Sequence, residues 1–162
     1  MPSVSEYKMT LDYRNAECAD MERCMEIRGM TNDNPMTISE FANIGVNSSN
    51  WCPLIESGEF LGVVCEVNNV VVGFCFGEAK SGEILVLAIL SEYEGLGFGT
   101  KMLSIVGEKL LQSGSTMLWL AASPDPNIRA HGFYRSLGWT YTGKLDVHGD
   151  QILALANPEK PE

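Results

Sequence analysis

The sequence predicts an α/β sandwich around a mixed sheet that is mostly antiparallel in its first half. Two observations carry this prediction. Two β-branched runs are separated by only Asn68 and Asn69, as in a hairpin of antiparallel strands. Later in the chain, strand-like apolar runs alternate with helix-like stretches, which is typical of strand–helix–strand units. The expected order is β-α-α-β-β-β-α-β-α-β-β, with about seven strands flanked by about four helices.

The N-terminal elements follow from side-chain periodicity and from capping residues. Met9–Arg14 alternates apolar and polar side chains, which predicts the first strand. Asp20 is a good helix N-cap, and the helical spacing behind it predicts a helix that runs to about Arg28. A second helix is expected over Thr37–Asn43, after a turn-rich stretch.

The central hairpin is expected over Glu59–Val67 and Val70–Gly77, since two asparagines tolerate the positive φ of a two-residue turn. Simple alternation predicts that its core face carries Val63, Cys65, Val67, Val70, Val72, Phe74 and Phe76. The opposite face would then carry Gly62, Gly73 and Gly77. Glycines on that face would let another group approach the backbone closely.

A buried strand is expected over Glu83–Leu90, followed by a glycine-rich loop and a helix that ends at Gly114. The apolar stripe of that helix consists of Phe98, Met102, Ile105, Val106 and Leu110. Thr116–Ala122 predicts the next strand.

The last helix has a clear start signal. Asp125 as N-cap and Pro126 in the first helical position predict a helix that runs to about Ser136, before Gly138. The closing pair of strands is expected over Trp139–Thr142 and Gln151–Leu155.

Length and charge limit the classes of function. The 162 residues suit one domain, expected over residues 1–157 with a disordered tail over 158–162. Lys and Arg number 11 against 21 Asp and Glu, so the net charge is −10. Such an acidic chain is a poor match for nucleic acid or an anionic membrane, but it suits a cationic small partner. No apolar run approaches the ~20 residues of a membrane span, and no signal peptide is recognisable.

The cysteines and histidines indicate neither disulfides nor metal. The five cysteines are odd in number and lack a C-x-x-C spacing, which argues against a disulfide framework and against a zinc site. His131 and His148 also lack metal-ligand spacing. We therefore expect no metal and a cytoplasmic location.

The strongest chemical signal is the loop 94–100, EGLGFGT, between a strand and a helix. Glycines bring backbone N–H groups close to a ligand, and a helix N-terminus favours an anion, which predicts a pyrophosphate site. The spacing matches neither G-x-x-x-x-G-K-[ST] of a Walker A loop nor G-x-G-x-x-G of a dinucleotide fold. Asp125, after the next strand, keeps a Rossmann-type nucleotide binder as a minor alternative.

A second signal lies in the last helix. Asn127, Ala130 and Tyr134 stand at i, i+3 and i+7, so they are predicted to share one helix face. A tyrosine hydroxyl on that face could donate a proton to a leaving group. The alternative is an amphipathic helix with a tyrosine at its edge.

Together the two segments resemble the GNAT superfamily of acyl-CoA N-acyltransferases. Its signature joins [RQ]-x-x-G-x-[GA] to N-x-x-A-x-x-F-Y-x-x-L-G-[FW]. The second part matches from Asn127 to Trp139, and Gly97 and Gly99 match the first. The resemblance implies a GNAT-like sandwich, acetyl-CoA as co-substrate and no metal. It also implies CoA contacts at Leu87, Ala88, Ile89, Glu94, Gly95, Leu96, Gly97, Phe98, Gly99, Thr100 and Asn127.

The resemblance further implies catalytic roles. Tyr134 would be the general acid that protonates the CoA thiolate. Glu83 is the candidate general base, and a water chain to another carboxylate such as Glu78 or Glu66 is the alternative. Glu94 stands where the family usually has Arg or Gln, and its carboxylate would repel a pyrophosphate unless it points to solvent. Trp51 lies where the family shapes its acceptor site, so a pocket wall and a packed core residue are both open readings.

The expected function is transfer of an acetyl group from acetyl-CoA to a primary amine of a small molecule or peptide, by direct attack. The alternative is a non-catalytic acyl-CoA-binding or regulatory domain of the same fold, which Glu94 keeps open. The expected partner is the amine acceptor, which could be cationic, and neither nucleic acid nor a membrane. A homodimer is left open.

Overall fold

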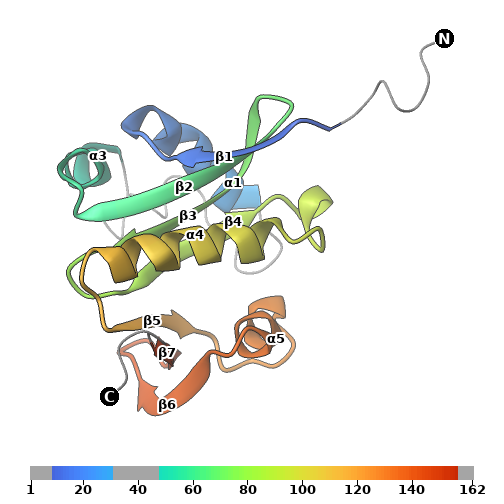
Figure 1. The fold of residues 1–162 in the computed structure, drawn as a ribbon. Coiled ribbons are helices and arrows are strands. Elements are labelled where there is room, and N and C mark those ends of the chain that lie inside the picture. Colours follow the sequence, from blue (N-terminus) through green and yellow to red (C-terminus); the bar gives the residue numbers. More distant parts are fainter. Residues whose placement is uncertain (1–8, 31–47, 157–162) are drawn as a thin grey trace.

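The computed structural model describes residues 9–30 and 48–156 (Figure 1). These residues contain seven strands and four α-helices, so the α/β prediction is confirmed. The expected helix over Thr37–Asn43 and the expected tail over 158–162 lie outside them. The elements are β1 (Leu11–Asn15), the short 3₁₀ helix η2 (Cys18–Asp20), α1 (Met21–Met30), α3 (Ser48–Ser57), β2 (Phe60–Val67), β3 (Val70–Glu78), β4 (Ile84–Ile89), the 3₁₀ helix η3 (Ser91–Tyr93), α4 (Phe98–Gln112), β5 (Met117–Ala122), α5 (Arg129–Ser136), β6 (Thr140–Leu145) and β7 (Gln151–Ala156).

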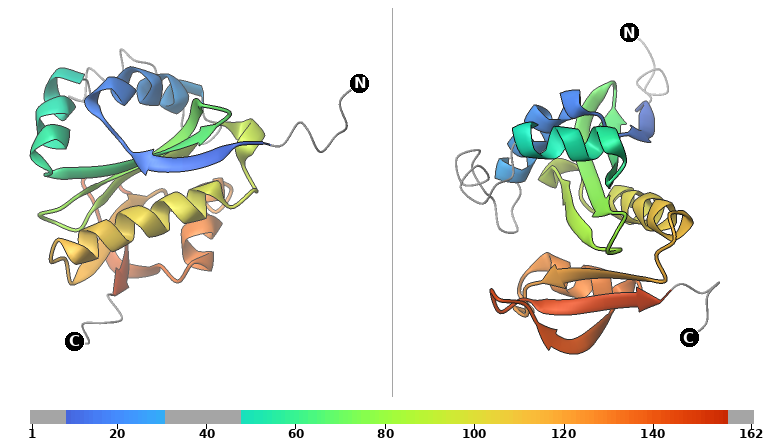
Figure 2. Two further views of the ribbon diagram at one scale, coloured as in Figure 1. Left: turned by 45° about the horizontal axis from the view of Figure 1, so that its top comes forward. Right: turned by 90° about the vertical axis from the view of Figure 1, so that its left-hand side faces the viewer.

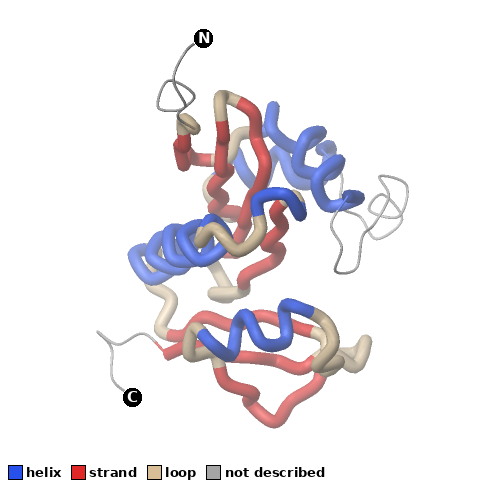
Figure 3. The backbone as a smooth tube through the Cα atoms, turned by 90° about the vertical axis from the view of Figure 1, so that its right-hand side faces the viewer, coloured by secondary structure: helices blue, strands red, loops and turns tan. Residues whose placement is uncertain are grey.

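The strands form two antiparallel sheets, in the order β1-β2-β3-β4 and β5-β7-β6. Helix α4 packs on β2, β3 and β4, while α1 and α3 cover the opposite face of that sheet (Figure 2). Helix α5 runs across the second sheet (Figure 3). No helix in the described ranges is long and apolar enough to cross a membrane.

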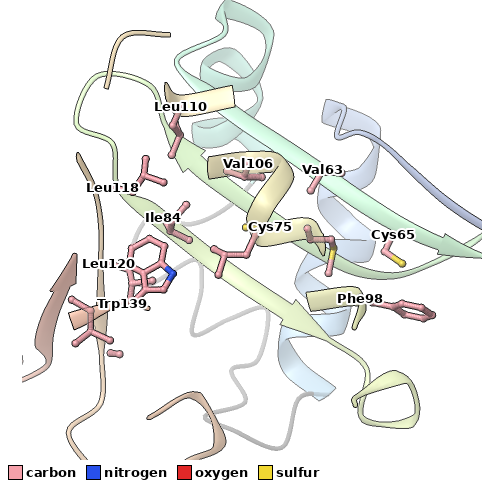
Figure 4. Close-up of a cluster of buried hydrophobic side chains, with 14 of the residues drawn as sticks. Val63, Cys65, Cys75, Ile84, Phe98, Val106, Leu110, Leu118, Leu120 and Trp139 are labelled. Carbon is pink, nitrogen blue, oxygen red and sulfur yellow. The ribbon is translucent and has the colours of Figure 1, made fainter. Parts of the chain in front are cut away.

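The larger of two buried clusters ties the sheets together through α4. Val106 and Leu110 of α4 pack with Val63 of the first sheet and with Leu118 and Leu120 of the second (Figure 4). The second cluster lies between the first sheet and helices α1 and α3. Both faces of the first sheet are therefore core.

The predicted hairpin turn is confirmed. Asn68 and Asn69 join β2 to β3 with φ of 51° and 67°, as expected for a two-residue turn.

The predicted faces of the hairpin are wrong, because a β-bulge interrupts the alternation. Val72 and Gly73 both face α4, although neighbouring residues of a regular strand face opposite sides. Phe74 and Phe76 therefore lie on the face opposite to the one that simple alternation predicts. Phe74 and Phe76 belong to the cluster beneath α1 and α3, whereas Val63 and Cys65 lie on the α4 side. A sequence pattern of period two cannot show where one residue is added.

The expected close approach to glycine is made by a helix. A Cβ on Gly73 would lie 2.9 Å from the Met102 Cε, and one on Gly77 would lie 2.7 Å from the Leu110 Cδ1. Helix α4 therefore packs directly on the bare backbone of β3. Gly62 lies on the other face, under the ring of Phe76, so the three glycines do not share one face.

Contrary to expectation, one disulfide is present. Cys18 in η2 is bonded to Cys52 in α3, with the two Cα atoms 4.9 Å apart. Helix α3 was not predicted, since Pro53 interrupts its pattern, and tertiary packing alone brings the two cysteines together. Cysteine usage therefore gives no support to the expected compartment. The other cysteines, Cys24, Cys65 and Cys75, are buried thiols.

Candidate active site

Strands β4 and β5 lie side by side only where they begin. Glu83 and Trp119 form an isolated parallel bridge, and the backbone N–H of Trp119 donates to the Gly82 carbonyl at 3.1 Å. Beyond this joint the strands diverge, and a cavity of about 990 Å³ opens between Ile84–Ile89 and Leu120–Ser123. Within the described residues, the cavity edge of β4 has no strand partner, so its backbone N–H and C=O groups can bind a ligand.

The glycine loop forms one end of this cavity. Gly95 and Gly97 have φ of 77° and 86°, and Gly97 is the N-cap of α4. A Cβ on either glycine would meet no atom within 4 Å, so the backbone here borders open space. The N–H groups of the first turn of α4 have no intrahelical acceptor, and the helix dipole adds positive potential. The loop can therefore hold an anionic group such as a pyrophosphate.

Tyr134, on α5, lines the same cavity. Its ring packs edge-on against Phe133 and Trp139, with centroid distances of 5.2 and 6.2 Å. Burial raises the pKa of the Tyr134 hydroxyl, the neighbouring Cys75 raises it further, and Arg28 opposes the shift. The phenol therefore keeps its proton across the neutral pH range.

Glu94 meets a partner that sequence reasoning missed. Its Oε2 lies 3.5 Å from the Nη1 of Arg129, the first residue of α5, and both side chains line the cavity. The Glu94 carboxylate therefore does not point to bulk solvent, and the positive charge of Arg129 opposes its negative charge at the anion site. The pair is partly exposed, with 54% of the Arg129 side chain accessible, so it contributes little to folding stability. Its position lets Arg129 attract an anion beside the glycine loop.

Most of the cofactor residues expected from the sequence surround the cavity. The lining includes Leu87, Ala88, Ile89, Glu94, Gly95, Gly97, Phe98, Gly99 and Thr100. Leu96 is exposed and outside the lining. Glu83 also lies outside it, at the closed end where β4 and β5 meet.

Asn127 is not on the helix face predicted for it. Helix α5 begins at Arg129, and Asn127 is an exposed turn residue whose N–H donates to the Asp125 Oδ1 at 2.9 Å. Asp125 closes this turn rather than capping a helix that starts at Pro126. Asn127 is also outside the cavity lining, so the predicted i, i+3, i+7 face with Tyr134 is wrong.

The cavity also contains residues that the motifs did not mark. Arg28 and Met25 come from α1, Asp150 comes from the turn before β7, and Arg129 comes from α5. No local signal separates them from ordinary surface or core residues. Trp51 fits both of its readings, since it lines the cavity and packs on the rings of Phe60 and Phe76.

The model of the Acetyltransferase (GNAT) family matches residues 23–139. The chain belongs to the GNAT acetyltransferase family. No curated protein matches it by sequence.

Solved GNAT structures share this fold at low sequence identity. PaiA N-acetyltransferase from Thermoplasma acidophilum, in complex with coenzyme A, is 15% identical with a TM-score of 0.77, over 91% of this chain and 99% of its own. YncA from Salmonella typhimurium, solved with its cofactor acetyl-CoA, is 18% identical with a TM-score of 0.71. The match covers 94% of this chain and 97% of YncA. The ribosomal-protein-S18-alanine N-acetyltransferase from Escherichia coli is 19% identical with a TM-score of 0.65, and the match covers 91% of this chain and 94% of that enzyme.

This GNAT domain shows no candidate metal centre in the part of the chain that the structure describes. No three His, Cys, Asp or Glu side chains gather there as ligands of an ion would. Within the described residues, the cavity lining itself offers backbone groups, two tyrosines and four charged side chains.

Proposed function

We propose that this GNAT protein transfers the acetyl group of acetyl-CoA to a primary amine of a small molecule or peptide. One observation carries the proposal: a single cavity joins the open backbone of the glycine loop to the edge of β4 and to Tyr134. The CoA-bound state of two proteins of the same fold supports it.

The substrate fits the residues that are present. The bare backbone at Gly95 and Gly97 leaves space for a pyrophosphate at the N-terminus of α4. The edge of β4 at Leu87–Ile89, which has no strand partner among the described residues, offers hydrogen bonds to an extended amide-containing arm. Arg129 supplies a positive charge at the phosphate end.

The chemistry follows from what an amide-forming reaction needs. The acceptor amine must lose a proton before it attacks, and backbone N–H groups on β4 stabilise the oxyanion that develops. Tyr134 then gives its proton to the departing thiolate, and its raised pKa keeps that proton available.

Acetyl-CoA should raise the melting temperature of the protein, whereas NAD and ATP should not. At about 100 times Kd, binding adds about 2.7 kcal/mol to the free energy of unfolding. Release of CoA thiol with a panel of amines then tests for turnover. A rise in melting temperature without any CoA release would favour the binding-domain alternative. An unchanged melting temperature with millimolar acetyl-CoA would refute the assignment of acetyl-CoA as co-substrate.

Gly97→Val should weaken acetyl-CoA binding at least tenfold, because the added side chain enters the space that the pyrophosphate needs. Gly58→Val is the matched control. Gly58 has φ of 85° and, like Gly97, no atom within 4 Å of the place where a Cβ would stand, but it lies at the end of α3. Both variants should lose similar stability, and only Gly97→Val should lose affinity in a calorimetric titration.

Glu94→Gln should tighten CoA binding, and Arg129→Gln should weaken it, each by about 3–10-fold. Removing the Glu94 carboxylate frees Arg129 and also removes a negative charge near the phosphates. Arg135→Gln is the control on the same helix, since that side chain donates to the His131 carbonyl and to Gln151 outside the cavity. Equal Kd values in all three variants would show that the ion pair plays no part in binding.

Glu83→Gln should flatten the acid limb of the pH–rate profile if Glu83 is the base. Burial raises the pKa of Glu83, and Glu78 and Asp146 raise it further. The acid limb of the profile should therefore lie at a higher pH than the pKa of an ordinary glutamate carboxyl would give. Asp150→Asn is the comparison, because Asp150 lines the cavity and burial also raises its pKa. Loss of the limb in Asp150→Asn alone would transfer the role to Asp150.

A further inference from the structure

In the part of the chain that the structure describes, the cavity wall that comes from α1, α3 and β3 contains one cation, Arg28, and otherwise apolar side chains. Among the described residues, the charged side chains of the lining are Arg28, Glu94, Arg129 and Asp150. Glu94 and Arg129 pair with each other beside the glycine loop. Arg28 stands apart from that pair, on the last turn of α1.

The cavity lining that the described elements next to Arg28 contribute is mainly apolar. The lining contributed by α1, α3 and β3 consists, besides Arg28, of Met21, Cys24, Met25, Trp51 and Phe74. Three of these side chains, Met21, Cys24 and Phe74, are almost fully buried, so they form a fixed wall. The charge of Arg28 also acts on the Tyr134 hydroxyl, and both side chains line the cavity.

We propose that the acceptor is a small amine that carries both a carboxylate and an apolar side chain, the simplest case being an apolar α-amino acid. This inference rests on the proposed acetyltransferase function and names its substrate class. The cavity position of Arg28, among methionine and aromatic side chains, carries it.

A guanidinium binds a carboxylate with two parallel hydrogen bonds, and its five N–H donors allow it to keep another contact at the same time. The apolar wall receives the acceptor side chain. Asp150, from the turn before β7, suits the ammonium end of the same molecule. A polyamine fits this wall poorly, because it would bring additional positive charge toward Arg28. The cavity therefore favours a zwitterion over the cationic acceptor that the net charge suggested.

The test compares acceptors that share one side chain. Methionine, methioninamide and 3-(methylthio)propylamine are assayed by release of CoA thiol from acetyl-CoA, with spermidine as the polyamine probe. The expected kcat/KM for methionine exceeds that for methioninamide by about 10–100-fold. The comparison is biased against the proposal, because the amine of the amide is less basic and more of it is unprotonated.

Variants then assign the preference to one side chain. In Arg28→Gln the methionine-to-methioninamide ratio should fall to about one through a rise in KM for methionine, and Arg28→Lys should restore part of it. Arg23→Gln is the control on the same helix: Arg23 donates to the Val71 carbonyl, lies outside the cavity lining, and should leave the ratio unchanged. The ratio is internal to each variant, so a partly unfolded fraction cancels.

The outcomes separate this inference from the proposed function. A wild-type ratio near one, a preference for spermidine, or a ratio that survives Arg28→Gln would overturn the substrate class, while amine-dependent CoA release would still support acetyl transfer. Acetyl-CoA binding with no release from any of the four amines would also overturn it. Loss of both the acetyl-CoA thermal shift and CoA release would overturn the two proposals together.

Discussion

A Tyr134→Phe variant is expected to bind acetyl-CoA almost normally and to lose about 10²–10⁴-fold in kcat. The substitution removes only the hydroxyl, so the ring contacts with Phe133 and Trp139 remain. Protonation of the departing thiolate occurs in the transition state, so its loss should reduce kcat and leave ground-state affinity unchanged. Steady-state kinetics and a calorimetric Kd on the same preparation measure the two effects.

Tyr93→Phe is the control for this experiment. Tyr93 also lines the cavity, but it stacks on Phe98 beside the glycine loop, with ring centroids 6.4 Å apart. Its hydroxyl has no assigned role, so turnover should stay within a few-fold of wild type. A Tyr134→Phe enzyme that turns over at the wild-type rate would make Tyr134 a packing residue and would remove the acid from the mechanism.

The pH dependence follows from the direction of the shift. A general acid is active while protonated, and burial raises the pKa of Tyr134 above its usual value of 10.0. The basic limb of the wild-type pH–rate profile should therefore lie above pH 10, as far as the fold survives. A basic limb at lower pH that disappears in Tyr134→Phe would show that the tyrosine titrates without the expected shift.

Gly82→Ala should destabilise the protein by about 2–4 kcal/mol. Gly82 has φ of 76°, and a Cβ there would lie 2.5 Å from the backbone carbonyl oxygen of Met117. A backbone atom cannot move aside as a side chain can. The Gly82 carbonyl also accepts the Trp119 N–H that joins β4 to β5, so the substitution should loosen the joint from which the cavity opens.

Gly58→Ala separates the clash from the backbone strain. Gly58 has φ of 85° with no atom near its Cβ position, so alanine there should cost only about 1 kcal/mol. Urea unfolding of both variants gives the difference, and acetyl-CoA titrations should show weaker binding for Gly82→Ala alone. Equal stability of the two variants would mean that the contact with Met117 is relieved at no cost.

Features that depend on a few consecutive residues could be predicted from the sequence. Asn68 and Asn69 require only their own backbone angles to form the turn, and Gly95 and Gly97 supply positive φ directly before a helix with a regular apolar stripe. Such preferences act within one turn of chain, so the hairpin, the glycine loop and the helix after it could be predicted, whereas α3 was not. The match of the second motif to the GNAT signature belongs to this local information.

Which side chains share the cavity follows from the packing of distant segments and could not be fully predicted from the sequence. The divergence of β4 from β5, the pairing of Glu94 with Arg129 and the presence of Arg28 in the same cavity lining as β5 each bring together segments far apart in the chain. The Cys18–Cys52 disulfide is of the same kind, since its cysteines are 34 positions apart in the sequence. These contacts arise from the packing of whole helices and sheets, which no local pattern encodes, because the same residue type serves equally well on a surface, in a core or in a site.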